Sequence, residues 1–441
     1  MKKGQLITEG KTKSIYAVEG NGELVIVSSK DDITAFDDAS YTKQFASKGE
    51  YATTTTCRIF ELLQQAGIPV AYKHQLSTHE FVAKKCDMIP LEVVARRLAV
   101  GSYLKRHPEL KTKITPHRFH RLEIEFFLKT TGGNLINNQG QAIVKGLIQK
   151  IDGKVKTLDD PLIDDHRSHN WELYHPKLPK WEKHANLGSL VNRADVVSQG
   201  IIRLEQMEDI TRKVFLLCEG AWNTLGIRIF DFKIEFGITT DNKLVVSDVI
   251  DNDSWRIRTF DWEDLSKQSF RDGEDLSVVE KKYGTVARLA TNIRVPKQAL
   301  VLWRGSGKDD WPKIGSDLEK AVYKIEHVTL SGHKSPVIAI NKLEELMAKY
   351  PDGGVIVAKV GRSNGLGPIL SARTSWPVIA IPATMEKSPE DIWSSLRMPS
   401  AVPLSTAWPE SNAIGQAMNI LAQKNPVIYM LTQFELEQFD N

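Results

Sequence analysis

The sequence predicts an α/β protein of two domains, and three observations lead to this. The chain has 441 residues, which is too long for one ordinary hydrophobic core. Its first two thirds mix strand patterns with long helical patterns. Its last third contains the apolar runs ALVLW, GVIVAKV and WPVIAIP, with an amphipathic stretch over 316–325. Buried strands that alternate with helices indicate a parallel sheet. We therefore place the domains at residues 1–295 and 296–441.

The elements of the first domain follow in order. Strands are expected in LITEGKTKSIYAV and in ELVIVSS near the amino terminus. Helices are expected over 53–67 and 200–225, each closed by a glycine. Residues 88–99 predict a strand that runs into a turn, and residues 130–190 are polar and indicate loops or an insertion. Residues 229–250 predict a pair of strands.

The composition excludes several classes of protein. Hydrophobic residues make up 41%, charged residues 26%, and the net charge is +3, which is ordinary for a globular protein. No run of about 18 apolar residues is present, and MKKGQLITEG has no apolar segment of a signal peptide. The three cysteines are scattered without disulfide or zinc spacing. A cytosolic protein that binds neither membrane nor nucleic acid is expected.

The strand pair over 229–250 contains the leading candidate site. In IFDFKIEFG, apolar and charged residues alternate, so one face of the strand is aromatic and the other charged. A two-residue turn at Asp241-Asn242 would place Glu235 directly opposite Asp248, about 5 Å away. Two opposed carboxylates need a cation between them, and magnesium is often bound by such carboxylates together with substrate phosphates. Lys233 adds a phosphate or carboxylate binder. A solvated hairpin, or another register, is the alternative.

Two further segments suggest anion binding. Gly10-Lys11-Thr12 ends like a P-loop, but the glycine spacing is wrong and a strand pattern follows, so a P-loop is rejected. A Gly-Lys turn between strands can still cover phosphates, although a plain basic hairpin would look the same. IPLEVVARRLAVGSYLKRHPE, residues 89–109, combines an arginine pair with a Gly-Ser turn. A solvated basic face, or nucleic-acid binding over 96–120, is the alternative.

Two loops of the last third follow apolar runs, where parallel sheets bind ligands. They are SGHK (331–334) and GRSNGLGP (361–368). His333 could move protons and Lys334 could hold a carboxylate, although ordinary turns would have the same composition. The dinucleotide pattern G-x-G-x-x-G is absent, so NAD is not favoured. His166 and His169 of HRSH have no cysteine partners, and we interpret them as solvated.

Together these motifs resemble a known family. MIPLEVVARRLAVGS and IFDFKIEFG are similar to the two signatures of SAICAR synthetase (phosphoribosylaminoimidazole-succinocarboxamide synthase). EGKTKSIY, DITAFDD, KQSFRD and DVIDNDSWR fit the same family. GRSNGLGP and WSSLRMPS resemble class II AIR carboxylase, and this order of domains resembles the bifunctional purine-synthesis enzymes of animals.

The resemblance implies a fold, two reactions and an assembly. It implies an α+β domain related to ATP-grasp enzymes and a three-layer α/β/α carboxylase domain with a parallel sheet. The carboxylase would add CO2 to aminoimidazole ribonucleotide (AIR) without biotin, giving carboxyaminoimidazole ribonucleotide (CAIR). The synthetase would join CAIR to L-aspartate with ATP and Mg2+. A cytosolic homo-octamer is implied as well.

The resemblance also implies roles for single residues. Gly10, Lys11, Thr12 and Lys13 correspond to the ATP-phosphate loop, and Glu235 and Asp248 to the magnesium ligands. The substrate-binding positions of the synthetase are Arg96, Ser102, Asp160, Asp231, Lys233 and Arg256. In the carboxylase, His333 and Lys334 are the expected catalytic residues, and Ser306, Ser331, Arg362 and Ser363 the expected substrate-binding residues.

The sequence departs from the family patterns, mostly in the carboxylase. The usual Gly-Ser-x-Ser-Asp loop reads GSGKDD, the usual Ser-Ala-His-Lys reads SGHK, and a GLGCST-like loop reads AVPLST. Because catalysis depends on geometry, these changes raise an alternative. In this alternative the chain is a synthetase only, and its last third is a catalytically weakened oligomerisation module. In the synthetase the departures are milder: Val100, TTTT at 53–56, and an apparent insertion over 127–157.

Overall fold

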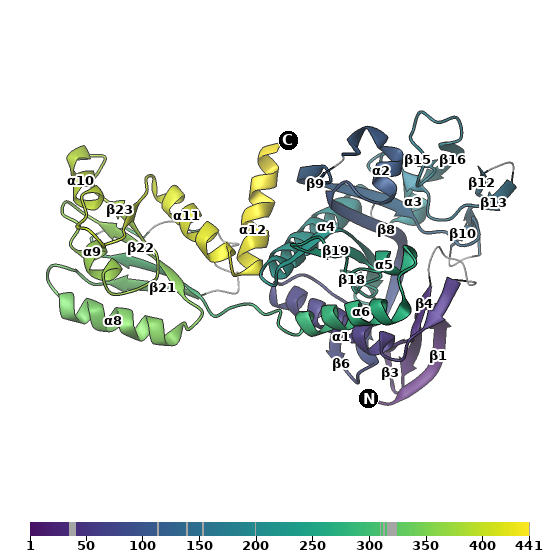
Figure 1. The fold of residues 1–441 in the computed structure, drawn as a ribbon, viewed down its shortest axis with the longest axis horizontal. Coiled ribbons are helices and arrows are strands. Elements are labelled where there is room, and N and C mark those ends of the chain that lie inside the picture. Colours follow the sequence, from purple (N-terminus) through teal and green to yellow (C-terminus); the bar gives the residue numbers. More distant parts are fainter. Residues whose placement is uncertain are drawn as a thin grey trace. The chain divides into compact units, whose positions relative to one another are not determined.

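A computed structural model describes residues 1–34, 41–112, 114–137, 140–151, 154–198, 200–308, 310–311, 314 and 324–440 of the chain. Its internal contacts divide the chain into two compact units, shown in Figure 1. The first unit is Met1–Ile293 with Leu436–Asn441, and the second is Arg294–Glu435. The chain therefore leaves the first unit near residue 293 and returns to it for its last residues. The helix expected over 316–325 lies largely outside the described residues.

The largest sheet of the first unit has eight strands, in the order β16-β15-β14-β9-β8-β17-β18, with β19 pairing to β17. β17 pairs with β8, β18 and β19, all antiparallel. Its position among three strands explains why the predicted functional residues of different segments meet on it. The strands are β8 (Cys86–Leu98), β9 (Arg118–Leu128), β14 (Leu162–Ile163), β15 (Asn170–Tyr174), β16 (Asn186–Asn192), β17 (Ile227–Thr239), β18 (Leu244–Ser247) and β19 (Trp255–Thr259).

A second antiparallel sheet has the order β1-β2-β3-β7-β6. It begins at the amino terminus, as the sequence predicts. Short two-stranded pairs lie in the loop after β3 and in the first part of the polar region over 130–190, which was predicted as loops or an insertion; the later part of that region supplies β14, β15 and β16 of the large sheet. The strands of the second sheet and of the short pairs are β1 (Lys3–Glu9), β2 (Lys13–Val18), β3 (Asn21–Ser29), β4 (Asp32–Thr34), β5 (Thr42–Gln44), β6 (Tyr72–Gln75), β7 (Glu80–Lys84), β10 (Leu135–Ile136), β11 (Ala142–Val144), β12 (Ile148–Ile151) and β13 (Lys154–Thr157).

The two long predicted helices are present. α1 (Lys48–Gln65) begins five residues earlier than expected, and α4 (Gly200–Asn223) matches its predicted range closely. Gly67 and Gly226, which follow them, have φ of +74° and +76°, the left-handed conformation that favours glycine after a helix. Shorter helices are α2 (Ser102–Arg106), η2 (Pro108–Leu110), α3 (Arg193–Val196), α5 (Gln268–Arg271), α6 (Leu276–Ala290) and η4 (Glu437–Asp440).

The aromatic face of β17 packs against the core. Phe230, Phe232, Ile234 and Phe236 are each at most 2% exposed. Phe232 meets Phe215 of α4 edge to face, with ring centroids 5.3 Å apart. This confirms the alternation seen in IFDFKIEFG and explains its aromatic side chains, since large rings bury much apolar surface and anchor the strand.

The predicted register of the β17–β18 hairpin is wrong by one residue. Glu235 pairs with Ser247, and Asp248 lies beyond the end of β18. The turn lies where expected, but its loop has three residues, because Thr239 N donates to Lys243 O at 3.0 Å. Asn242, with φ of +59°, takes the left-handed position that ends such a loop. The carboxylate directly opposite Glu235 is Glu92 of β8.

The second unit is a parallel sheet between two helical layers. The strand order is β21-β20-β22-β23-β24, and all four pairs are parallel. Alternate residues of its strands are buried in two separate clusters, one lined by α8 and the other by α11. This confirms the three-layer α/β/α prediction. The elements are β20 (Ala299–Arg304), β21 (Lys324–Thr329), β22 (Gly354–Val360), β23 (Val378–Pro382), β24 (Ser405–Thr406), α8 (Pro336–Lys349), α9 (Leu366–Ser371), η3 (Pro389–Ile392), α10 (Trp393–Leu396), α11 (Glu410–Ala422) and α12 (Pro426–Leu436).

Within the described part of the chain, no helix has both the length and the apolar character needed to cross a membrane.

Candidate active sites

A row of charged side chains crosses four neighbouring strands of the large sheet. Asp231 of β17 lies opposite Arg96 of β8 on one side and Arg256 of β19 on the other. Nη1 of each arginine donates to Oδ2 of Asp231 at 2.5 Å. Nε of Arg96 donates to Glu125 of β9 at 2.6 Å, and Glu125 also pairs with Arg106. Three guanidinium groups thus share two carboxylates, so the row keeps an excess positive charge that suits an anion.

The loop after β8 closes against this row. Nη2 of Arg96 donates to Oγ of Ser102 at 3.4 Å. Gly101 has φ of +59°, and a Cβ on it would lie 2.4 Å from Nη2 of Arg256. Glycine is required here because it both tolerates this backbone conformation and lets the guanidinium lie against the chain. The structure therefore brings together Arg96, Ser102, Asp231 and Arg256, four of the six residues that the resemblance assigns to substrate binding in the synthetase.

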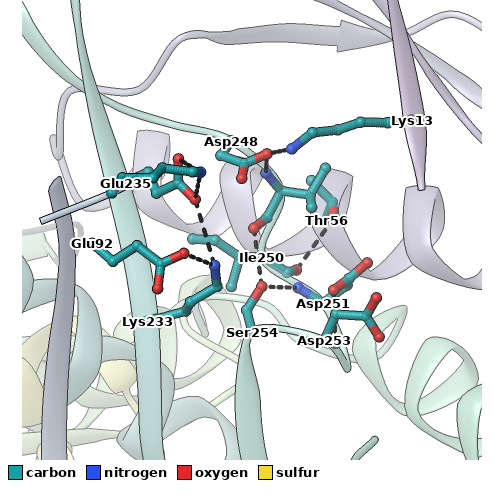
Figure 2. A network of polar contacts seen from close by, with 12 residues as sticks. Lys13, Thr56, Glu92, Lys233, Glu235, Asp248, Ile250, Asp251, Asp253 and Ser254 are labelled. Atoms are coloured by element: carbon teal, nitrogen blue, oxygen red, sulfur yellow. Dashed lines mark hydrogen bonds and ion pairs between the residues drawn. The ribbon is translucent and has the colours of Figure 1, made fainter. Parts of the chain in front are cut away.

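Farther along β17, lysines converge on Glu235 (Figure 2). Nζ of Lys129 donates to both oxygens of Glu235 at 2.5 Å. Nζ of Lys233 donates to Glu92 at 2.5 Å and to Glu235 at 3.5 Å. Lys233 therefore supplies the positive charge that the opposed carboxylates of Glu92 and Glu235 require.

Lys13 and Asp248 complete this lysine–carboxylate cluster. Lys13, the first residue of β2, forms an ion pair with Asp248, and Figure 2 shows the two side chains reaching toward each other from different elements. Asp248 has φ of +69°, a left-handed conformation directly after β18. Burial lowers the pKa of Lys13 to about 8; Glu235 opposes this shift, whereas Lys129 and Lys233 add to it. Crowded ammonium groups of this kind suit a polyphosphate.

The carboxylates of the cluster fit magnesium. Burial acts to raise the pKa of Glu235, but the nearby charges of Lys233 and Lys129 outweigh it and hold that pKa below its ordinary value, so Glu235 is ionised. No group of three or more His, Cys, Asp or Glu side chains in the described ranges is placed to hold a metal. Two carboxylates together with phosphate oxygens are a donor set that magnesium commonly uses.

The predicted phosphate loop lies between β1 and β2. Gly10 N donates to Lys13 O at 2.8 Å, which makes a tight turn, and Lys30 Nζ donates to Gly10 O at 3.0 Å. Lys11 and Thr12 form the tip of this turn. Because β2 follows at once, the rejection of a helical P-loop is confirmed.

Asp160 lies in a turn beside the lysine–carboxylate cluster. It has φ of +53°, and its Oδ1 accepts from Thr130 N at 3.1 Å. Burial acts to lower the pKa of Lys233, but the charges of Glu92 and Glu235, and to a smaller extent that of Asp160, outweigh it and raise that pKa above its ordinary value. The neighbouring Asp159 accepts from Gly132 N and Gly133 N at 3.1 and 2.8 Å.

In the second unit, the candidate residues follow the carboxyl ends of three adjacent parallel strands. Ser306 follows β20, Ser331 follows β21, and the GRSNGLGP loop follows β22. Because β20 lies between β21 and β22, these loops emerge at the same edge of the sheet. Oγ of Ser306 accepts from Lys308 N at 3.2 Å, and Oγ of Ser331 accepts from Lys334 N at 3.2 Å.

His333 lies against the GRSNGLGP loop. A Cβ on Gly365 would lie 2.3 Å from Nε2 of His333, so the ring covers this glycine directly. A Cβ on Gly332 would lie 2.7 Å from Gly365 O, which makes both glycines necessary for the approach of the two loops. Arg362 and Ser363 are exposed at the start of the second loop.

The two carboxylase-like motifs also contact each other. Asn364 N donates to Ser394 Oγ at 3.1 Å, and its Nδ2 donates to Ser395 Oγ at 3.0 Å. Gly367 N donates to Oδ1 of Asn364 at 2.8 Å. The serines of WSSLRMPS therefore fix the shape of the GRSNGLGP loop.

The interpretation of His166 as solvated is wrong, and three residues of the charged clusters were not predicted. His166 is not solvated: its ring stacks on Phe126 with centroids 4.3 Å apart, and its Nε2 lies 3.3 Å from Glu208. His169 is exposed as expected. Glu92, Glu125 and Lys129 belong to the charged clusters, but none of them was predicted, although Glu92 lies within the signature MIPLEVVARRLAVGS. Strand pairing to β8 and β17 could have suggested the two glutamates.

Comparison with known proteins decides the family. The family model of SAICAR synthetase matches residues 6–289. The chain belongs to the SAICAR synthetase family. The family model of AIR carboxylase matches residues 305–438, so an AIR carboxylase domain follows the synthetase domain. The resemblance inferred from the signatures is confirmed for both domains, one of a ligase family and one of a lyase family.

Curated relatives carry both domains or the first alone. The chain is 32% identical over 443 residues to a "Probable multifunctional protein ADE2" of Caenorhabditis elegans, covering 96% of this chain and 92% of that protein. It is 31% identical over 446 residues to the human bifunctional phosphoribosylaminoimidazole carboxylase/phosphoribosylaminoimidazole succinocarboxamide synthetase, covering 97% and 92%. A phosphoribosylaminoimidazole-succinocarboxamide synthase of Chloroflexus aurantiacus is 36% identical over 303 residues, covering 66% of this chain and 97% of that protein.

Proposed function

We propose that the SAICAR synthetase domain joins CAIR to L-aspartate with the consumption of ATP. The observation that carries this is the charged face of β17. Asp231 lies in the arginine row, and Glu235, four residues later, lies in the lysine–carboxylate cluster with Lys233 between them. Four residues of strand span roughly 13 Å, so an anionic ribonucleotide and a nucleoside triphosphate would meet on the charged face of β17.

The chemistry explains why the site is built from cations. A carboxylate is a poor acyl donor, so its oxygen must first attack the γ-phosphorus of ATP, forming an acyl phosphate and releasing ADP. The amine of aspartate then attacks the carbonyl carbon, phosphate leaves, and the nitrogen loses a proton. Phosphoryl transfer needs positioning and charge stabilisation more than a protein nucleophile.

Each cluster has a distinct task in this reaction. Arg96, Ser102 and Arg256 would hold the anionic groups of the ribonucleotide, and Asp231 would keep the two arginines in place. Lys13 and Lys129 would exchange their present carboxylate partners for the phosphates of ATP, with the Gly10–Thr12 turn beside them. Glu235 and Asp248 would hold Mg2+, which neutralises phosphate charge when bound. Asp160 and Lys233 would also contact the ribonucleotide.

The carboxylase domain would form CAIR from AIR and CO2. In this reaction, the ring carbon of AIR bonds to the carbon of CO2 and loses a proton. Support comes from His333 and Lys334, which lie at the edge of the sheet with Ser306, Ser331, Arg362 and Ser363. His333 would accept the proton, and the cation of Lys334 would hold the new carboxylate. Neither reaction requires biotin.

The altered GSGKDD and AVPLST loops favour a second candidate for this domain, an oligomerisation module with weakened catalysis. A cytosolic homo-octamer remains a proposal for either candidate. CO2-dependent conversion of AIR by the full-length protein decides between the two. Clear turnover excludes the weakened module, and turnover at the background rate excludes the carboxylase. ATP- and aspartate-dependent consumption of CAIR tests the synthetase in the same preparation.

A further inference from the structure

Glu437, four residues before the last residue of the sequence, is buried in the synthetase unit. It is 3% exposed, whereas the preceding Leu436 is 43% exposed. Its Oε1 accepts from Nη2 of Arg97 at 2.8 Å, and its Oε2 accepts from Leu122 N at 3.2 Å. Nη1 of Arg212 lies 3.6 Å from Oε2. A buried carboxylate with three partners, all in the synthetase unit, is a specific contact.

Glu437 binds β9 where its pairing with β8 is irregular. Arg96 pairs with Glu123, but Leu98 pairs with Arg118 instead of the residue at 121. Because β9 has extra residues here, some of its backbone N–H and C=O groups cannot form hydrogen bonds with β8. Buried groups of this kind need other hydrogen-bond partners.

Arg97 and Glu437 supply these partners. Nη1 of Arg97 donates to Phe119 O at 3.2 Å and to His120 O at 2.5 Å. Leu122 N donates to Glu437, and Leu122 O accepts from Arg212 at 2.7 Å. The irregular stretch Phe119–Leu122 is therefore held by an arginine of β8, an arginine of α4 and a glutamate from the chain end.

This stretch leads directly into the arginine row. Arg97 is the neighbour of Arg96 on β8, and Leu122 is followed on β9 by Glu123, opposite Arg96, and then by Glu125, which accepts from Arg96 at 2.6 Å. A shift of β9 at Leu122 would move Glu125 and with it the guanidinium of Arg96.

We propose that Glu437 is a positioning residue for the synthetase reaction, acting through Arg97 and β9 on Arg96 and Glu125. The proposal rests on the proposed role of the arginine row in holding the ribonucleotide. It means that residues at the end of the AIR carboxylase match, Leu436–Asn441, belong to the synthetase unit, so that a synthetase cut at residue 295 lacks part of its own structure.

The test uses full-length protein with Glu437→Gln, which keeps the shape of the side chain and removes its charge, and with Glu437→Asp, which keeps the charge. Glu435→Gln, an exposed glutamate two residues earlier, is the matched control. For Glu437→Gln we expect a roughly tenfold higher KM for the carboxylated ribonucleotide, because residues coupled in one network interact strongly. The KM for ATP should stay unchanged, Glu437→Asp should be less affected, and amide exchange over 117–126 should be faster.

Faster amide exchange with an unchanged ribonucleotide KM would mean a structural role only and would overturn the proposal. So would equal rises in both KM values, or behaviour identical to Glu435→Gln. A wild-type chain without synthetase turnover would instead refute the proposed function. The exchange comparison would then still show whether Glu437 fixes β9, since it requires no turnover.

Discussion

Replacement of Gly365 by alanine tests whether the packing of His333 on the GRSNGLGP loop supports carboxylation. An alanine Cβ would lie 2.3 Å from Nε2 of His333, whereas ordinary contacts begin at 3.4 Å. The ring must therefore move by about 1 Å, because it is the more mobile of the two groups. A misplacement of about 1 Å can lower a rate by roughly 100-fold, which corresponds to about 2.7 kcal/mol in activation free energy. We expect CO2-dependent conversion of AIR to fall by about this factor.

The same loop offers a matched control. A Cβ on Gly361 would lie 3.7 Å from Cγ2 of Thr384, an ordinary contact, so Gly361→Ala should keep nearly full carboxylase turnover. The synthetase reaction of each variant, measured in the same preparation, checks that the protein is intact. Carboxylase turnover of Gly365→Ala close to the wild-type value would refute the idea that this glycine positions a catalytic histidine.

Three further predictions concern the synthetase domain. Glu235→Gln should leave thermal unfolding nearly unchanged and remove most ATP-dependent turnover; near-normal turnover would exclude the magnesium role. Gly101→Ala should displace Arg256, whose Nη2 lies 2.4 Å from the added Cβ, and raise the ribonucleotide KM by roughly 10-fold or more; an unchanged KM would exclude Arg256 from binding. A hydrogen bond with His166, together with the hydrogen bonds of Arg212 and Arg167 and the charge of Arg212, holds the pKa of Glu208 well below its usual value of 4.5, so the stabilising effect of this carboxylate is complete above about pH 4.5 and is lost as the pH falls further. Denaturant unfolding should therefore show the stability difference between wild type and Glu208→Gln shrinking below pH 4.5, and a pH-independent difference would contradict this.

Local patterns predicted much of the fold. The alternation in IFDFKIEFG identified β17, the glycines at 67 and 226 marked the ends of α1 and α4, and the apolar runs after residue 296 identified the parallel strands. These features could be predicted because the period of apolar residues, the end of a helix and the burial of a strand depend on residues that are close in the sequence.

The register of the hairpin was less predictable. Asp241-Asn242 indicated a turn correctly, but a two-residue and a three-residue loop can use the same residues. The difference of one residue moves Asp248 past the end of β18 and places Glu92 opposite Glu235. Only the backbone hydrogen bond from Thr239 N to Lys243 O shows which of the two loops forms.

Partners that lie far apart in the chain could not be predicted. Lys129 meets Glu235, and Glu437 meets Arg97, across 106 and 340 residues. A lysine after an apolar strand or a glutamate near the chain end resembles an ordinary surface residue. Their roles follow from sheet order and from the path of the chain back to the first unit.

The most direct measurement is a coupled assay of the purified full-length protein with CAIR, aspartate, ATP and Mg2+. We predict one equivalent of ADP for each succinocarboxamide product, and no product when ATP or aspartate is omitted. ADP release without the amide product, or no turnover of CAIR under these conditions, would contradict the assignment of the charged face of β17 to amide ligation.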